Sequence, residues 1–102
     1  MLSVIIPAYN EEGMVDKTAS VVSEILSNAN ICCELIFVDD GSKDKTWEKL
    51  LAIASTNTSV HGIKFSRNFG KEAAIIAGMT VAKGECCVVI DCDLQHPPEK
   101  IV

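Results

Sequence analysis

Short apolar runs alternate with amphipathic segments along the whole chain. The apolar runs are rich in β-branched residues and predict strands at residues 3–7, 34–38, 60–65 and 86–90. Between them, apolar residues recur every three or four positions, which is the spacing of one face of a helix. Strands that are apolar on both faces and separated by helices favour a parallel sheet covered on each side. The pattern therefore predicts an α/β fold, Rossmann-like and doubly wound, with a mainly parallel sheet.

Each predicted helix presents one apolar face to this sheet. The faces are Val15, Ala19, Val22 and Leu26 in the first helix, Trp47, Leu50, Leu51 and Ala54 in the second, and Ala73, Ile76, Ala77 and Val81 in the third. Asp44 is expected to cap the second helix and Gly84 to end the third. Pro97 and Pro98 predict the first turn of a fourth helix. Because that helix has hardly begun at Val102, we expect residues 1–102 to be part of a domain truncated at its carboxy end.

Composition and charge narrow the classes of function. A net charge of -5, from 9 basic and 14 acidic residues, has the wrong sign for a protein that binds nucleic-acid phosphates. The longest apolar runs are far shorter than the roughly 20 residues that span a bilayer, so we expect this piece of the protein to be soluble. The first residues enter a strand without the basic start and apolar stretch of a secretory signal, which favours the cytoplasmic side.

The cysteines invite a metal or disulfide interpretation that their spacing does not favour. They are Cys32, Cys33, Cys86, Cys87 and Cys92, and none forms a CxxC pair. Adjacent cysteines on a strand point to opposite faces of the sheet and cannot easily hold one metal ion together. A free cysteine behaves as a small core residue, and an odd number fits a reducing compartment. We therefore expect buried, reduced thiols.

A polar cluster follows each predicted strand. These clusters are residues 7–12, 39–42, 66–71 and 91–96. Because the carboxyl ends of parallel strands lie along one edge of a sheet, and ligands of open α/β sheets bind there, the four clusters should converge on one crevice.

Neither of the glycine-rich phosphate-binding loops is present. The first strand runs into PAYNEE rather than GxGxxG, and GxxxxGK[ST] is absent. A diphosphate would therefore need a divalent cation to approach this acidic edge. Asp91 and Asp93 are two residues apart, so an extended chain projects both carboxylates to the same side. Such oxygen ligands suit Mg²⁺ or Mn²⁺. The competing interpretation is two solvated acids that cap the following helix.

Other side chains at this edge have a binding interpretation and a structural one. Tyr9 could stack on a nucleobase or be a partly exposed core aromatic. Asp39 or Asp40 could accept hydrogen bonds from a base or ribose, or form an Asx turn. Arg67 and Lys71 are the positive partners available to phosphate oxygens, and Lys71 fits a solvated helix start equally well.

Four segments in this order resemble a known family. SVIIPAYNEE, IFVDDGSKDKT, FSRNFGKEAAIIAG and VVIDCDLQHPPE are similar to the amino-terminal half of family 2 glycosyltransferases with the GT-A fold. They resemble more closely the polyprenyl-phosphate hexosyltransferases, which include bactoprenol glucosyltransferases and dolichol-phosphate mannose synthases. The resemblance covers nearly the whole chain. It implies that residues 1–102 are the nucleotide-sugar-binding part of a GT-A domain.

The resemblance also implies roles for individual residues. It places Pro7, Tyr9, Glu11, Val38 and Asp40 in the nucleotide pocket, with Asp39 beside them. Asp91, Cys92 and Asp93 fill the DxD position, where the two acids hold the metal and Cys92 stands in for the usual Ala. Gln95 would lie close to the donor, although a capping role also fits it. An exposed loop position suits His96 better than a metal ligand, and the acceptor-side catalytic residues are expected beyond Val102.

The activity implied is an inverting, metal-dependent hexose transfer from a nucleoside-diphosphate sugar to a polyprenyl phosphate. The segment SRNFGKEAA favours the bactoprenol-glucosyl branch, and hence UDP-glucose as the donor. The full-length enzyme would be membrane-associated at the cytoplasmic side of the cell membrane, in cell-wall or lipopolysaccharide biogenesis. The 102-residue piece alone would be inactive. An oligomer is compatible with the sequence.

Three other functions compete with this one. The first is a family 2 transferase that acts on a polysaccharide or another glycan, and the second is a non-catalytic nucleotide-binding module. The third is a phosphorylatable receiver domain, which also groups aspartates at strand ends. In receiver domains the acidic pair usually follows the first strand, whereas Asp39 and Asp40 follow the second, so this reading is disfavoured.

Overall fold

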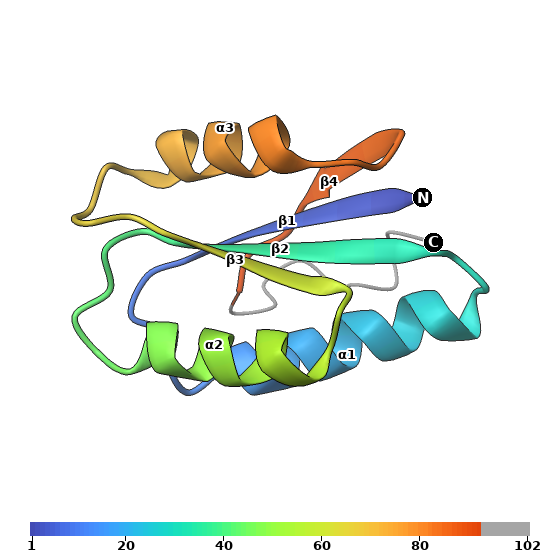
Figure 1. The fold of residues 1–102 in the computed structure, drawn as a ribbon, viewed down its shortest axis with the longest axis horizontal. Coiled ribbons are helices and arrows are strands. Elements are labelled where there is room, and N and C mark those ends of the chain that lie inside the picture. Colours follow the sequence, from blue (N-terminus) through green and yellow to red (C-terminus); the bar gives the residue numbers. More distant parts are fainter. Residues whose placement is uncertain (93–102) are drawn as a thin grey trace.

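In the computed structural model, which describes residues 1–92, four strands form one parallel sheet (Figure 1). The strands are β1 (Leu2–Ala8), β2 (Cys33–Asp39), β3 (Val60–Lys64) and β4 (Cys86–Val89). Their order across the sheet is β3-β2-β1-β4, and all three pairings are parallel. All four predicted strands are confirmed. The predicted helix at Pro97 and Pro98 lies outside the described residues.

Helices cover both faces of this sheet. Helices α1 (Val15–Asn28) and α2 (Thr46–Thr56) lie on one face, and α3 (Lys71–Val81) lies on the other (Figure 1). Each helix joins two parallel strands, which confirms the doubly wound α/β fold. No helix in the described part of the chain is both long and apolar enough to cross a membrane.

The two inner strands, β1 and β2, are buried on both faces. Val4, Ile6 and Phe37 pack with Leu26 and other apolar residues of α1 and α2 in the larger core cluster. The smaller cluster lies under α3, where Ile36 and Val38 of β2 meet Ala74, all three fully buried. Double coverage explains why these strands are continuous apolar runs rather than alternating ones.

The apolar face predicted for α1 is confirmed, but the face predicted for α2 is wrong at one position. Val15, Ala19, Val22 and Leu26 are all buried in the core. In α2, Leu50 is buried, whereas Leu51 is 51% exposed. Helix α2 packs against β3 at the edge of the sheet, so its buried stripe is narrow and excludes Leu51.

The buried face of α3 differs from the predicted one. Ile76 and Val81 are exposed, and the buried residues are Ala74 and Gly78. Of the predicted face, Ala73 is half-buried and Ala77 packs, partly buried, against the smaller core cluster. A Cβ atom at Gly78 would lie only 2.6 Å from Cγ2 of Ile5 in β1, so a larger residue would push the helix away. Close packing through small residues therefore sets the orientation of α3. In this helix the small residues are buried, whereas the large apolar residues Ile76 and Val81 are exposed.

The cysteines also depart from the expected burial. They are free thiols, but only Cys92 is buried; Cys33 is half-buried, and Cys32, Cys86 and Cys87 are exposed. Cys86 and Cys87 begin β4, which pairs only with β1 among the described strands. An edge strand lacks the double coverage that buries the inner strands.

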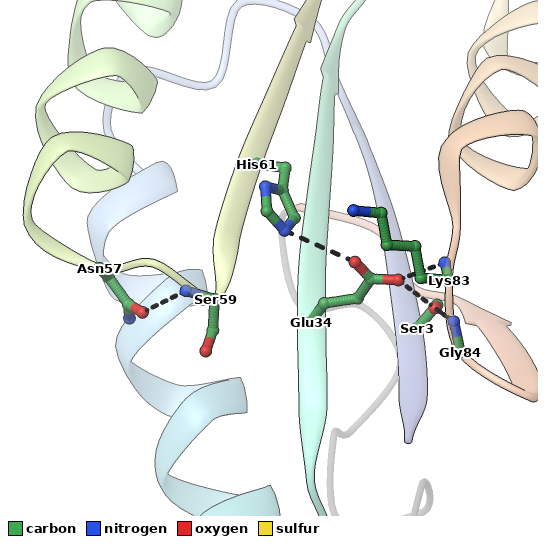
Figure 2. A network of polar contacts seen from close by, with 7 residues as sticks. All are labelled: Ser3, Glu34, Asn57, Ser59, His61, Lys83 and Gly84. Atoms are coloured by element: carbon green, nitrogen blue, oxygen red, sulfur yellow. Dashed lines mark hydrogen bonds and ion pairs between the residues drawn. The ribbon is translucent and has the colours of Figure 1, made fainter.

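A buried carboxylate connects three strands to the turn between α3 and β4 (Figure 2). Oε2 of Glu34 accepts hydrogen bonds from the Ser3 hydroxyl and the Lys83 backbone N–H, both at 2.6 Å. Nε2 of His61, on β3, lies 3.5 Å from Oε1. The N–H of Gly84 donates in turn to Oγ of Ser3 at 2.8 Å. Glu34 thus holds this turn against the amino ends of β1 and β2.

Gly84 belongs to this turn and does not end the helix, contrary to the prediction. Helix α3 ends at Val81, and Ala82 has an extended backbone. A Cβ atom at Gly84 would lie 2.5 Å from Oγ of Ser3 and 2.8 Å from its backbone nitrogen. Glycine is therefore required for the close approach of this turn to β1.

Replacing Glu34 tests the contribution of this network to stability. Burial alone would raise the pKa of Glu34, but hydrogen bonds from Ser3 and Lys83 and the nearby His61 hold it below the usual 4.5. The stabilisation is therefore complete above the unfolded-state pKa and is lost as pH falls through the lower folded-state pKa. We expect Glu34→Gln to lower the free energy of unfolding by about 1–3 kcal/mol near pH 7, measured by urea denaturation.

The matched control is Glu85→Gln, because the Glu85 side chain is 91% exposed. We expect this control to change the free energy of unfolding by less than about 0.5 kcal/mol. Near pH 3 the difference between Glu34→Gln and the wild type should shrink. An equal difference at both pH values would contradict the role given to the Glu34 charge.

Candidate functional site

Residues at or just beyond the carboxyl ends of β1, β2 and β4, together with the first residue of α3, line one pocket of about 340 Å³. Its lining residues are Pro7, Ala8, Tyr9, Glu11, Asp40, Lys71, Asp91 and Cys92. The pocket lies at the carboxyl edge of the sheet, so the predicted convergence of the polar clusters on one crevice is confirmed.

The loop after β1 presents Tyr9 and Glu11 without any glycine. Asn10 takes the left-handed conformation there, with a φ of 53°, which asparagine adopts more readily than most residues. Its N–H donates to Oγ of Ser42 at 2.8 Å, and its side-chain oxygen accepts the Lys43 N–H at 2.8 Å. The loop is thereby joined to the β2–α2 loop, and Tyr9 remains 41% exposed at the pocket.

Asp44 strengthens the same junction. Its Oδ1 accepts the Thr46 N–H at 2.9 Å at the start of α2, and its Oδ2 accepts the Glu12 N–H at 3.3 Å. Desolvation would raise the pKa of Asp44, but these bonds and one from the Thr46 hydroxyl hold it below its usual value. The cap residue of α2 is Lys45 and not Asp44, so the predicted cap is one position off. Asp44 nevertheless accepts the first N–H of the helix, that of Thr46.

The adjacent acids Asp39 and Asp40 differ in position. Asp39 is fully buried, and its Oδ1 accepts the Ser42 N–H at 3.0 Å, three residues on rather than the two of the Asx turn that we expected. Its other oxygen has no hydrogen-bond partner among the residues that the structure describes. Asp40 lines the pocket, while its carboxylate accepts the N–H groups of Phe69 at 2.8 Å and Gly70 at 3.1 Å. Asp40 therefore fixes the residues that begin α3.

Gly41 brings the β2–α2 and β3–α3 loops into direct contact. Its φ is 72°, and a Cβ atom there would lie 2.3 Å from the carbonyl carbon of Arg67. The Arg67 guanidinium stacks over the Phe69 ring, 4.7 Å from its centroid, and does not line the pocket. A glycine is thus needed at this crossing, and Arg67 lies outside the pocket.

The predicted site residues therefore divide into three groups. The pocket brings together Pro7, Tyr9, Glu11, Asp40, Lys71, Asp91 and Cys92. Val38 and Asp39 are buried in β2, and Arg67 is exposed, stacks on Phe69 and is not among the residues that line the pocket. Asp93, Gln95 and His96 lie outside the described residues.

Lys71 and Asp91 form an ion pair inside the pocket. Nζ of Lys71 lies 2.5 Å from Oδ1 of Asp91, and the two side chains are 58% and 21% exposed. Lys71 is the first residue of α3, and Asp91 follows the end of β4. The pair therefore joins the start of α3 to the segment after β4 across the pocket.

Thr18 is a residue of this site that sequence analysis missed. Its hydroxyl donates to the carbonyl oxygen of Cys92, and the Cys92 sulfur lies 3.9 Å from the Thr18 oxygen. The signal was a polar residue on the buried face of α1, three positions after Val15 and four before Val22. Thr18 ties α1 to the backbone next to Asp91.

The donor chemistry of the pocket fits a hard divalent cation. Glu11, Asp40 and Asp91 contribute carboxylates, and the Lys71 ammonium shows that Asp91 accepts a cation. Within residues 1–92, no group of three or more metal-ligating side chains is clustered. Mg²⁺ is usually held by one or two carboxylates together with substrate phosphates, so this small donor set suits a metal that arrives with its ligand.

Comparison with known proteins identifies relatives over nearly the whole chain. The family model for glycosyl transferase family 2 matches residues 3–101. A glycosyltransferase of Synechocystis sp. is 44% identical over 100 residues, which are 98% of this chain and 31% of that protein. The undecaprenyl-phosphate 4-deoxy-4-formamido-L-arabinose transferase of Aeromonas hydrophila is 39% identical over 102 residues, 99% of this chain and 31% of that protein. The chain thus spans about a third of the length of these relatives.

A solved structure supports the fold independently. The mannosyltransferase of Pyrobaculum calidifontis, in complex with GDP-Man and Mn²⁺, superposes with a TM-score of 0.82 at 24% identity. The match covers 97% of this chain and 29% of that one. It confirms the GT-A fold that the sequence motifs implied.

Replacing Thr18 tests its role in the site. Thr18→Val removes the donor to the Cys92 carbonyl while keeping the shape of the side chain, so we expect the free energy of unfolding to fall by about 1–3 kcal/mol. The control is Thr80→Val, because the exposed Thr80 hydroxyl bonds only within its own helix, to the Ile76 carbonyl. Urea denaturation measures both variants, and equal losses would contradict a special role for Thr18.

Proposed function

The chain belongs to glycosyltransferase family 2, and we propose that residues 1–102 form the nucleotide-sugar-binding part of a longer enzyme of that family. The observation that carries this proposal is the pocket at the carboxyl edge of the sheet, where Tyr9, Glu11, Asp40, Lys71 and Asp91 converge. Relatives roughly three times as long support the view that further parts of the enzyme complete the acceptor side.

We infer that the pocket binds a nucleoside diphosphate sugar together with Mg²⁺ or Mn²⁺. The exposed Tyr9 ring offers a surface for the base, and Glu11 offers an acceptor for ribose hydroxyls. Asp91, and by the sequence motif Asp93, would hold the metal. The GDP-Man and Mn²⁺ bound to the Pyrobaculum protein support this ligand class. UDP-glucose is the proposed donor, on the resemblance of SRNFGKEAA to the bactoprenol-glucosyl branch.

The proposed reaction is an inverting transfer in which an acceptor phosphate oxygen attacks the anomeric carbon of the sugar. A bound divalent cation would supply neutralisation of the charge that develops on the leaving diphosphate. The chain's own residues bind and orient the donor. The Asp91 carboxylate lines the pocket, and Asp40 fixes the start of α3 beside it. The acceptor-side catalytic group belongs to the rest of the enzyme in this proposal.

The proposed acceptor is a polyprenyl phosphate at the cytoplasmic side of the cell membrane. The Aeromonas relative, named for transfer involving undecaprenyl phosphate, supports this choice over a polysaccharide or another glycan. Membrane association would then belong to the full-length enzyme.

Metal-dependent nucleotide binding is the first test, made by calorimetry on the full-length protein. With Mn²⁺ present, we expect Asp91→Asn to weaken UDP binding by at least about tenfold, because a carboxylate that holds the metal is lost. The control is Asp16→Asn, since Asp16 is 66% exposed on α1 and pairs only loosely with Lys49, at 3.6 Å. Binding that needs no metal, or equal affinity in both variants, would contradict the proposed site.

Transfer of labelled sugar identifies the acceptor. The full-length protein with UDP-glucose and Mn²⁺ is expected to glycosylate a polyprenyl phosphate, whereas residues 1–102 alone should show no transfer, because the acceptor side is absent. Labelling of a polysaccharide instead of the lipid would replace the proposed acceptor. Transfer by the 102-residue chain would contradict the proposed division of the enzyme.

A further inference from the structure

The pocket already contains one cation on its metal-binding acid. The Lys71 ammonium lies 2.5 Å from Oδ1 of Asp91, where an incoming metal ion would bind. A carboxylate oxygen in contact with an ammonium group at this distance cannot also be approached by a divalent ion without strong repulsion between the two cations. Lys71 and the metal therefore compete for Asp91.

The surroundings of Lys71 allow its ammonium group to move while its backbone stays fixed. Asp40 holds the N–H groups of Phe69 and Gly70, the two residues before Lys71. The Lys71 side chain itself is 58% exposed and has a flexible four-carbon stem. The ammonium can thus leave Asp91 and still remain in the pocket that both residues line.

We propose that Lys71 is a movable counter-ion, which occupies Asp91 in the free protein, yields it to the metal, and then contacts the diphosphate that the metal accompanies. This inference rests on the proposed nucleotide-binding function and adds a role that the DxD motif does not specify. Before the ligand arrives, the Lys71 ammonium offsets one of the three negative charges of Glu11, Asp40 and Asp91.

The exchange predicts effects of opposite sign for the two ligands. Removing the Lys71 charge frees Asp91 of a competitor, so the metal alone should bind more tightly. The same change removes a positive partner of the diphosphate, so the metal–nucleotide complex should bind more weakly. Partly exposed charge pairs contribute modestly, so we expect about three- to fivefold in each direction.

The test uses Lys71→Met in the full-length protein. The control is Lys83→Met, which makes the same charge change just after the other end of α3, where the side chain is exposed. Free Mn²⁺ is titrated by electron paramagnetic resonance without nucleotide, and UDP is titrated by calorimetry at saturating Mn²⁺. Relative to the control, Lys71→Met should bind Mn²⁺ three- to fivefold more tightly and UDP about as much more weakly.

The outcomes separate this inference from the proposed function. If the wild type binds Mn²⁺ and UDP but Lys71→Met matches the control in either titration, or changes both affinities in the same direction, the counter-ion role is wrong while the site stands. If the wild type binds neither ligand, the proposed function fails and the inference with it. Lys71→Arg, which keeps the charge, should stay within about twofold of the control; behaviour like Lys71→Met would overturn the role of the charge.

Discussion

The candidate site depends above all on the carboxylate of Asp40 at the carboxyl end of β2. A parallel sheet brings four loops to one edge, but it does not set how those loops lie against each other. Asp40 does this for α3 by accepting the N–H groups of Phe69 and Gly70, which fixes the helix start. The contact between Gly41 and the Arg67 backbone leaves no alternative spacing for the two loops. The position of Lys71, and hence its pairing with Asp91, follows from this anchor.

The opposite end of α3 is held by the same kind of interaction. Glu34 accepts the Lys83 N–H just beyond the helix, at the amino edge of the sheet (Figure 2). Between these two anchors α3 contacts the sheet through Ala74 and Gly78, which bury little apolar surface. A helix with so small an apolar contact gains less from packing than α1 does. Two buried carboxylates, Asp40 at one end of α3 and Glu34 at the other, therefore compensate for the small apolar contact in the middle of the helix.

The inner strands and α1 could be predicted from sequence because they bury large apolar residues. The spacing of such residues along the chain then indicates which positions are buried. The buried face of α3 could not be predicted in this way. Ala74 and Gly78 are buried because they are small enough for the helix to lie close to the sheet, not because they are large and apolar. The convergence of the loops followed from topology alone. Which acid of the adjacent pair lines the pocket depends instead on local backbone hydrogen bonds: Asp39 turns to Ser42, and Asp40 faces the pocket. Thr18 was missed because its partner is a backbone carbonyl distant in sequence.

Two of the acids in the pocket, Asp40 and Asp91, have partners that stabilise their negative charge. The Asp40 charge is stabilised by backbone N–H groups at the amino end of a helix, where the helix dipole also favours a negative group. Asp91 has an ammonium partner in Lys71. Two of the three pocket acids are thus stabilised without any ligand, although one ammonium against three carboxylates leaves the pocket acidic. A bare diphosphate would add more negative charge to this acidic pocket, whereas a diphosphate that carries a divalent cation brings most of its own compensation. For the nucleotide binding that we propose, this arrangement would favour the metal complex over the free nucleotide, because the site lacks a glycine-rich phosphate loop.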